Sequence, residues 1–556
     1  MRRLLKRWQH WILVLLLWAI FLAGAAGILF LWKSDVSDLP ETTKEDRAAG
    51  EDKSVGEDRT AGEDRLAGGK GEFEGRGKGD GKEEDGVEGK GEGMWLFAGR
   101  IGGMEYFSGV VRSGKLIGGK RGFPSGKGER WEEQEGNLEP KPESSGEEEK
   151  EPPVVFIASD LHYQSPLTTD YGRAYQEFVA ESDGKMVDYL PQLLDAFIDE
   201  MIEARPDAFL LTGDITMNGE RVNHEELAGK LGRLLDAGVP VLVIPGNHDI
   251  HNYRARLYFG DEEEETESVS LDEFTELYQD FGWNQAISRD EGSFSYIYPL
   301  REKVWLMLLD TAQYDPLNIV DGVVRPGTLA WMEENLEKAK ELGIQVIVSG
   351  HHNLLQESRL FTDMCVLENS DEVLSLLERY RLPLYISGHL HLQRIQKHRR
   401  EPGDGGYGID EIVSDALSIP PCQYGVLSWD EDEGISYETR RVGVSAWAKK
   451  TGQEDEALLD FEHYQKEYVQ ELIKAQIMEK TSRLPESTAQ EMAALYAKVY
   501  GDYCAGLKVR RRDIEGTKGY HSWQRYLPDS KEFKEIKSMV KDSMGENNFW
   551  ESRGSE

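Results

Sequence analysis

The chain has 556 residues and a formal net charge of -38 at pH 7, from 65 Lys and Arg residues against 103 Asp and Glu residues. This length is enough for two or three folded domains with at least one large core. The acidic balance argues against extended nucleic acid as a partner, because binding to it needs clustered Lys and Arg. Three cysteines, Cys365, Cys422 and Cys504, are too few for a disulfide framework and lack metal-ligand spacing, so we expect small buried apolar side chains.

The N-terminus carries a long apolar segment. Four basic residues within positions 2–7 precede an uncharged run from Trp11 to Trp32, and Asp35 follows it. A helix of this length crosses a bilayer, and the charge asymmetry places its N-terminus in the cytoplasm. We therefore expect a membrane anchor over residues 1–33, in a single-pass cell-membrane protein whose remaining residues are extracytoplasmic. Ala23-Gly24-Ala25 resembles a cleavage site, so a cleaved signal peptide and a secreted protein are the alternative.

Residues 34–152 consist mainly of Gly, Glu, Lys, Asp and Arg, with few aliphatic residues. Such a segment buries too little apolar surface to offset the loss of chain entropy on folding. We predict a low-complexity, disordered tether that is solvated. Within it, a more apolar stretch from Met94 to Phe123 is expected to form a hairpin or to dock on the folded part.

From Pro153 onward, strand patterns alternate with helix patterns. Five β-rich apolar runs predict buried strands, at residues 154–157, 209–211, 241–244, 346–348 and 384–386. Amphipathic helices are predicted near residues 186–204, 224–236, 329–342 and 371–381. The alternation favours a mainly parallel sheet covered by helices, and further strand-like segments suit a second sheet. We therefore expect an α/β domain over residues 153–445.

After residue 445 the strand patterns stop. Helical periodicity runs through residues 454–480, 487–511 and 531–544, and the segments between contain Pro485, Gly516-Thr517-Lys518-Gly519 and Pro528. These residues interrupt helices, so we predict a small C-terminal helical domain over residues 446–556.

Five short motifs follow the five predicted strands in turn. They are Asp160-Leu161-His162, Gly213-Asp214, Gly246-Asn247-His248-Asp249, Gly350-His351 and Gly388-His389-Leu390-His391. Each motif alone is weak evidence, but together they hold five of the twelve histidines, which scattered core histidines would not do. The ends of buried strands are where an α/β sheet places its chemistry. Mixed carboxylate and imidazole ligands suit Mn, Fe or Zn, so we expect two divalent metal ions.

The order and content of these motifs resemble the calcineurin-like metallophosphoesterase superfamily, whose pattern is D-x-H, G-D, G-N-H-D, G-H and G-H-x-H. The resemblance covers residues 153–442 and implies a two-sheet α/β sandwich with helical flanks and a dinuclear site at the strand ends. The metal ligands that it implies are Asp160, His162 and His391 for one ion, Asn247, His351 and His389 for the other, and Asp214 as a bridge. It also implies that His248 contacts the phosphate and protonates the leaving group, while Asp249 fixes the tautomer of His248.

Three longer stretches, Thr212–Glu220, His224–Leu227 and Pro245–Ile250, are similar to exported bacterial cyclic nucleotide phosphodiesterases with a C-terminal helical domain. This resemblance implies hydrolysis of a cyclic nucleotide or related phosphodiester by a metal-bridging hydroxide. The alternatives are a phosphomonoesterase or an enzyme acting on lipid or wall-polymer phosphates. A non-catalytic surface-binding module is the alternative from another class, although all the ligands are retained. We expect a small phosphate-ester substrate and a membrane contact through the N-terminal helix; the sequence identifies no protein partner.

Two histidines close to the motifs in sequence each have two possible roles. His352 contacts substrate or stacks at the rim of the site, and His224, at a predicted helix start, caps that helix or contacts substrate.

Overall fold

The computed structural model describes residues 152–361, 364–398, 408–430, 434–543 and 545–552, together with four short strands between residues 98 and 117. The predicted membrane anchor and most of the predicted tether lie outside the described residues. Among the described helices, none combines the length and apolarity needed to cross a membrane. Where the sequence predicts a hairpin, the structure has two: β1 (Ala98–Ile101) pairs with β2 (Met104–Phe107), and β3 (Val110–Arg112) pairs with β4 (Lys115–Ile117).

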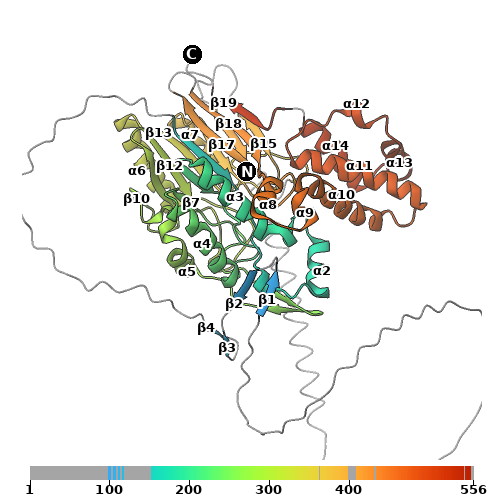
Figure 1. The fold of residues 1–556 in the computed structure, drawn as a ribbon. Coiled ribbons are helices and arrows are strands. Elements are labelled where there is room, and N and C mark those ends of the chain that lie inside the picture. The colour runs from blue at the N-terminus through green and yellow to red at the C-terminus, as the bar shows by residue number, and fades with distance from the viewer. Residues whose placement is uncertain are drawn as a thin grey trace, which may run out of the picture. The chain divides into compact units, whose positions relative to one another are not determined.

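The first large sheet contains six strands in the order β19-β18-β17-β5-β6-β7 (Figure 1). Its parallel part consists of β5 (Val154–Ala158), β6 (Ala208–Leu211) and β7 (Val241–Val243), which are the first three predicted runs. Beside β5 the chain adds β17 (Gln423–Asp430) and β18 (Gly434–Arg441), both in antiparallel pairs.

The second large sheet contains seven strands in the order β10-β11-β12-β13-β14-β16-β15. Its parallel centre is formed by β12 (Val304–Leu309), β13 (Gln345–Gly350), β14 (Leu384–Ser387) and β16 (Asp410–Val413). Antiparallel strands flank this centre: β10 (Ser288–Arg289) and β11 (Tyr296–Arg301) on one side and β15 (Arg394–Lys397) on the other. The prediction of mainly parallel sheet is therefore correct only for the centres, because short connections such as that between β11 and β12 join antiparallel neighbours.

Alternation along the strands explains how the layers pack. In β12, Leu306 and Leu308 join the core that contains the first sheet, whereas Met307 and Leu309 join a second core on the other face. That second core includes helices α6 (Pro326–Leu342) and α7 (Ser370–Arg379). Because successive side chains of a strand point to opposite faces, one face of the second sheet packs on the first sheet and the other on helices.

Helices α3 (Leu190–Ala204) and α4 (Arg221–Asp236) belong to the core of the first sheet. Phe197 of α3 lies with its ring centroid 4.7 Å from that of Tyr424 in β17 and 5.3 Å from that of Phe209 in β6. Smaller helices α2 (Arg173–Glu181) and α5 (Leu271–Tyr278) lie in the connections. The predicted α/β fold with two sheets and helical flanks is thus confirmed for the described residues.

Seven described helices follow β18: α8 (Val444–Thr451), α9 (Glu456–Leu459), α10 (Phe461–Lys480), α11 (Glu486–Cys504), α12 (Arg511–Ile514), α13 (Lys518–Tyr526) and α14 (Lys531–Asp542) (Figure 1). Buried residues of α8 and α9 belong to the core of the first sheet, whereas the later helices build most of a separate core. Trp523 of α13 is fully buried in this separate core beside Phe533 of α14. At residues 516–519 the sequence predicts only a break between helices. Instead Thr517 caps α13, its hydroxyl accepting a hydrogen bond from the Tyr520 amide, since threonine favours N-caps.

After α14 the chain returns to the first sheet as β19 (Phe549–Glu551), which pairs antiparallel with β18. The Trp550 side chain is buried, and its Nε1 donates to Asp410 Oδ2 at 2.7 Å. This strand was not predicted, because three residues carry too short a pattern.

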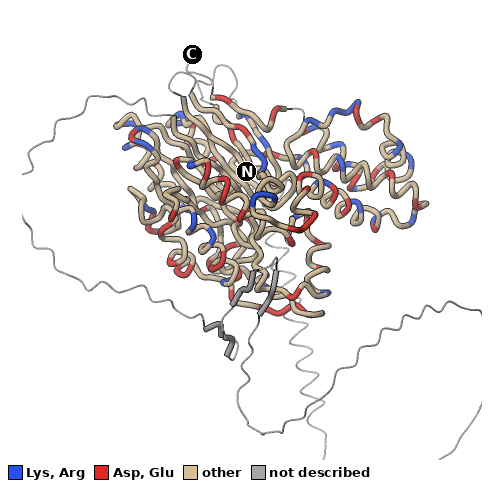
Figure 2. Tube along the Cα trace, viewed as in Figure 1, with Lys and Arg blue, Asp and Glu red and all other residues tan. Residues whose placement is uncertain are grey.

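The central strands β5, β6, β7, β12, β13 and β14 contain no charged residue, whereas the helices carry many (Figure 2). The side chains of all three cysteines are buried.

Candidate metal centre

The five motifs meet at one place because their strands end there. Asp160 and Asp214 follow β5 and β6 of the first sheet, whereas His351 and His389 follow β13 and β14 of the second. Backbone hydrogen bonds connect the motif loops, from the Asp160 amide to the Gly213 carbonyl at 3.1 Å and from the Gly388 amide to the His351 carbonyl at 3.0 Å. The site is thus held between the two sheets, at the carboxyl ends of their parallel strands.

The first ligand cluster consists of Asp160, His162, Asp214 and His391, with one ligand atom of each lying within 4.8 Å of all the others. The Nε2 atoms of His162 and His391 are 2.9 Å apart, and His391 Nε2 lies 3.3 Å from Asp160 Oδ1. Asp160 Oδ1 is buried without a hydrogen-bond partner. Buried carboxylate oxygens need a donor or a cation, so this cluster fits a divalent ion.

The second cluster shares Asp214. Its Oδ2 lies 3.2 Å from His351 Nε2, which in turn lies 3.2 Å from His389 Nδ1. Asn247 is buried, its side-chain oxygen has no hydrogen-bond partner, and the amide of the next residue, His248, donates to Asp214 Oδ1 at 2.8 Å. The donor set of carboxylate, imidazoles and an amide oxygen fits a second divalent ion.

His352 also has a ring nitrogen within 4.8 Å of the ligand nitrogens of His351 and His389. Both of its ring nitrogens are engaged, however, with Nδ1 at 2.8 Å from Thr311 Oγ1 and Nε2 at 2.9 Å from the Val320 carbonyl. Its buried ring is therefore a packing element, and Asn247 remains the fitting ligand. His224 is likewise buried, with Nε2 at 2.9 Å from the Asp249 carbonyl, so it neither caps α4 nor faces the site.

Hydrogen bonds on the far side of three ligand rings fix their orientation. His351 Nδ1 lies 2.8 Å from the Thr212 carbonyl, His389 Nε2 lies 3.0 Å from the Met364 carbonyl, and His391 Nδ1 lies 2.6 Å from Asp183 Oδ2. An acceptor at one ring nitrogen places the proton there and leaves the other nitrogen free to bind a metal ion. Asp183 was missed by sequence reasoning because it lies in no motif and far from His391 in the chain.

The backbone is strained at the site. Five of the seven predicted ligands have positive φ angles: Asp160 (51°), His162 (43°), Asp214 (49°), His389 (72°) and His391 (53°). Such angles are unfavourable for residues other than glycine and gather at functional sites.

Two of the glycines before the ligands lie in close contact with a neighbouring motif loop. A Cβ atom on Gly388 would lie 1.8 Å from Ser159 Oγ, and one on Gly246 would lie 2.2 Å from Asp214 Oδ1. Glycine at these positions therefore permits close approach of the motif loops.

The predicted contact between Asp249 and His248 is wrong. In the described structure the Asp249 carboxylate accepts hydrogen bonds from the amides of Gly246, Ile215 and Thr216. It therefore fastens two motif loops together. His248 Nδ1 instead lies 2.7 Å from the Met217 carbonyl and 3.0 Å from Asn218 Oδ1, and its Nε2 lies 4.0 Å from Asp214 Oδ2.

Burial and neighbouring charges shift the pKa values of two ligands, Asp214 and His389. Burial raises the pKa of Asp214, but the nearby His351 and His248 outweigh burial and hold that pKa well below its usual range. Burial lowers the pKa of His389 to about 4. Asp214 is thus an anion and His389 is neutral, the states in which both bind metals. The His248 side chain is 24% exposed while those of His162 and His351 are fully buried, so the site opens to solvent beside His248.

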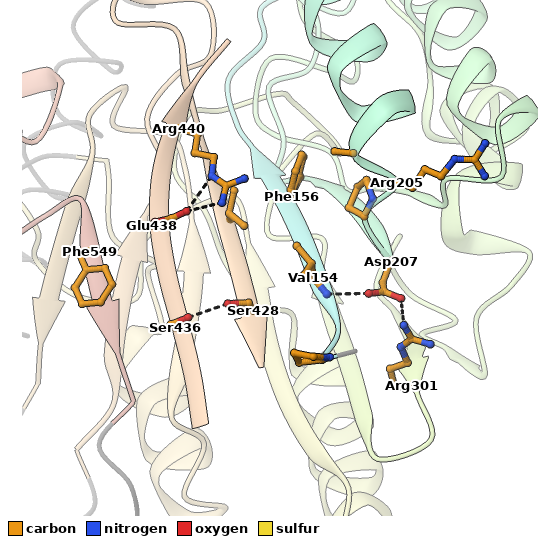
Figure 3. A pocket seen from close by; sticks show the side chains of 14 residues that line it. Val154, Phe156, Arg205, Asp207, Arg301, Ser428, Ser436, Glu438, Arg440 and Phe549 are labelled. Carbon is orange, nitrogen blue, oxygen red and sulfur yellow. Dashed lines mark hydrogen bonds and ion pairs between the residues drawn. The ribbon is translucent and has the colours of Figure 1, made fainter. Parts of the chain in front are cut away.

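A hollow of about 570 Å³ lies elsewhere, beside the amino ends of β5 and β6 (Figure 3). Val154 and Phe156 of β5 line it, whereas the metal ligands follow the opposite end of that strand. Two of its arginines are paired within it, Arg301 with Asp207 and Arg440 with Glu438. This hollow is therefore not part of the metal centre.

Residues 153–393 match the family model described as calcineurin-like phosphoesterase. The chain carries a calcineurin-like phosphoesterase domain. This result confirms the predicted superfamily and the enzyme class, a metal-dependent phosphoesterase. Residues 443–546 match a second model, the C-terminal domain of cyclic nucleotide phosphodiesterase.

One curated relative of the phosphoesterase domain is the 3',5'-cyclic-nucleotide phosphodiesterase alr5338 of Nostoc sp. It is 24% identical over 207 residues, which cover 36% of this chain and 64% of the relative, less than two thirds of its length. Two similar solved structures are a dimetal phosphatase from Danio rerio (15% identity, TM-score 0.38) and GAP50, the anchor in the inner membrane complex of Plasmodium (11% identity, TM-score 0.29). The match to the dimetal phosphatase covers 52% of this chain and 96% of the phosphatase chain. The match to GAP50 covers 53% of this chain and 86% of the GAP50 chain.

Proposed function

We propose that the protein is a phosphodiesterase that uses two divalent ions, Mn, Fe or Zn, to hydrolyse cyclic nucleotides or related small phosphodiesters. The observation that carries the reaction class is the pair of adjacent ligand clusters, in which Asp214 Oδ2 of the first lies 3.2 Å from His351 Nε2 of the second. The C-terminal family match and the name of the Nostoc relative support the substrate class.

The two clusters would hold two divalent ions, which would supply the positive charge for activating water and stabilising the phosphoryl group. The chain's own residues do the rest. The hydrogen bond from His248 Nδ1 to the Met217 carbonyl fixes the ring, so Nε2 faces Asp214 and the solvent-exposed opening. A sugar alkoxide leaving from a cyclic nucleotide is a strong base, and a protonated His248 Nε2 is placed to neutralise it.

The full chain, stripped of metal by a chelator, is expected to lose hydrolysis and to regain it when Mn²⁺ is added. The decisive measurement is a side-by-side turnover panel of cyclic nucleotides, glycerophosphodiesters and phosphate monoesters. Highest turnover for cyclic nucleotides supports the proposal, and preference for monoesters or lipid headgroups supports the alternatives. Undiminished activity in the chelated protein would exclude the metal-dependent mechanism.

For the location we propose a single-pass membrane protein with an extracytoplasmic catalytic domain, on the basis of the basic residues at 2–7 and the apolar run from Trp11 to Trp32. In cell fractionation the protein is expected in the membrane fraction, with the catalytic domain cut by protease added outside the cytoplasmic membrane. A released protein lacking residues 1–33 would instead support the cleaved signal peptide, and a protected cytosolic protein would refute both.

A further inference from the structure

One segment connects the metal centre to the C-terminal helices. Residues 182–185 follow α2, and Asp183 within them accepts from His391 Nδ1 at 2.6 Å through Oδ2 and from Lys185 Nζ at 2.6 Å through Oδ1. Both carboxylate oxygens are thus engaged, one by a predicted metal ligand and one by an ammonium group. The corresponding acceptors for His351 and His389 are backbone carbonyls.

Helix α10 holds the backbone on both sides of Asp183. Gln476 Nε2 donates to the Ser182 carbonyl at 2.9 Å, and the Tyr468 hydroxyl donates to the Lys185 carbonyl at 3.1 Å. Between them Gly184 has a φ of 109°, and a Cβ there would lie 2.9 Å from Val469 Cγ2 of the same helix. The segment therefore lies directly against α10 in a conformation that favours glycine.

On its other side the segment leads to the first ligand cluster. The Met186 amide donates to the Ser418 carbonyl at 2.7 Å, and the Ser418 hydroxyl donates to the Asp160 carbonyl at 2.8 Å. Asp183 thus lies between a helix of the C-terminal domain and two residues, Asp160 and His391, of one cluster.

We propose that Asp183 is a positioning residue for His391, and that the C-terminal helical domain holds the geometry of this metal site through residues 182–185. A carboxylate that accepts the Nδ1 proton keeps the imidazole in one tautomer, directs Nε2 at the ion and increases its basicity. Lys185 fixes the second carboxylate oxygen and so the plane of the group. The inference rests on the proposed function only in taking the two clusters as metal sites.

The first test is the binding of Mn²⁺ to the full chain without substrate, measured by isothermal titration. Asp183→Ala is expected to lower the affinity for one of the two Mn²⁺ ions by about 10- to 100-fold. This is the usual effect of removing the hydrogen-bond partner of a metal-binding histidine. The other equivalent stays unchanged. Asp183→Asn keeps the shape of the side chain and is expected to fall between Asp183→Ala and the unmodified protein. If Asp183→Ala or Asp183→Asn folds, by circular dichroism, and binds both equivalents with unchanged affinity, the positioning role is wrong.

The second test removes the contacts from α10. Tyr468→Phe combined with Gln476→Ala is expected to weaken the same Mn²⁺ equivalent and to lower kcat more than it raises KM. The matched control is Tyr496→Phe, which removes a hydroxyl on α11 that donates to Glu535 Oε2 within the helical domain. Unchanged Mn²⁺ affinity in the double variant, or equal weakening in the control, overturns the role of the domain. If the unmodified chain binds no Mn²⁺, the proposed function fails instead.

Discussion

Asp214→Asn is expected to reduce phosphodiester hydrolysis on the order of 10³-fold, because it removes the charge that both metal sites share. Among the described carboxylates, Asp214 is the one in both clusters, with Oδ2 at 3.2 Å from His351 Nε2 and 4.0 Å from His162 Nε2. The asparagine keeps the size of the side chain, so it can still accept the His248 amide hydrogen bond. Turnover of a chromogenic phosphodiester with Mn²⁺, together with the Mn²⁺ content of the protein, measures the effect.

Asp195→Asn is the control for this substitution. Asp195 pairs with Lys230 and Arg233 on the helices and has no part in the site, so its loss is expected to leave turnover unchanged. An Asp214→Asn protein with normal turnover and two bound Mn²⁺ ions would refute the shared-ligand account.

His248→Ala is expected to retain both Mn²⁺ ions and to lose turnover by about 10²- to 10⁴-fold for substrates with alkoxide leaving groups. For a nitrophenyl ester, whose leaving group needs no proton, the loss is expected to be much smaller. The reason is geometric: His248 lies at the exposed opening, with Nε2 directed at Asp214. The measurement is kcat across a series of leaving groups, read as a change in the slope of rate against leaving-group basicity.

His521→Ala, at an exposed position of α13, is the control histidine substitution and is expected to leave this slope unchanged. Equal losses for good and poor leaving groups in His248→Ala would assign His248 to phosphate binding alone. A protein that loses Mn²⁺ would make His248 a ligand.

The elements that sequence predicts well here are buried strands followed by motif residues. For β5, β6 and β7, continuous apolar runs specify strands buried on both faces, and the motif after each places a ligand at the strand end. The superfamily resemblance supplied the division of ligands between two ions, and Asp160, His162 and His391 do lie together.

What sequence did not provide depends on contacts between distant segments. Asp183 meets His391 across 208 positions, and no local pattern marks it. Asp249 follows His248 directly, yet its carboxylate accepts hydrogen bonds from the amides of Ile215 and Thr216. The position of Asp249 next to His248 in the sequence does not predict these partners. The positive φ angles of Asp160 and His162 likewise arise from the packing of loops rather than from residue type.

The return of the chain from the helical domain as β19 has a mechanical consequence. The domain leaves the first sheet after β18 and comes back to pair with that same strand, Tyr437 opposite Trp550, so it is tethered at two adjacent points. A domain on one linker swings about a single hinge, whereas this one can turn only if the β18–β19 ladder opens and the Trp550 indole leaves Asp410. A force applied to either end of the helical domain is therefore transmitted to β18 and β19 of the first sheet.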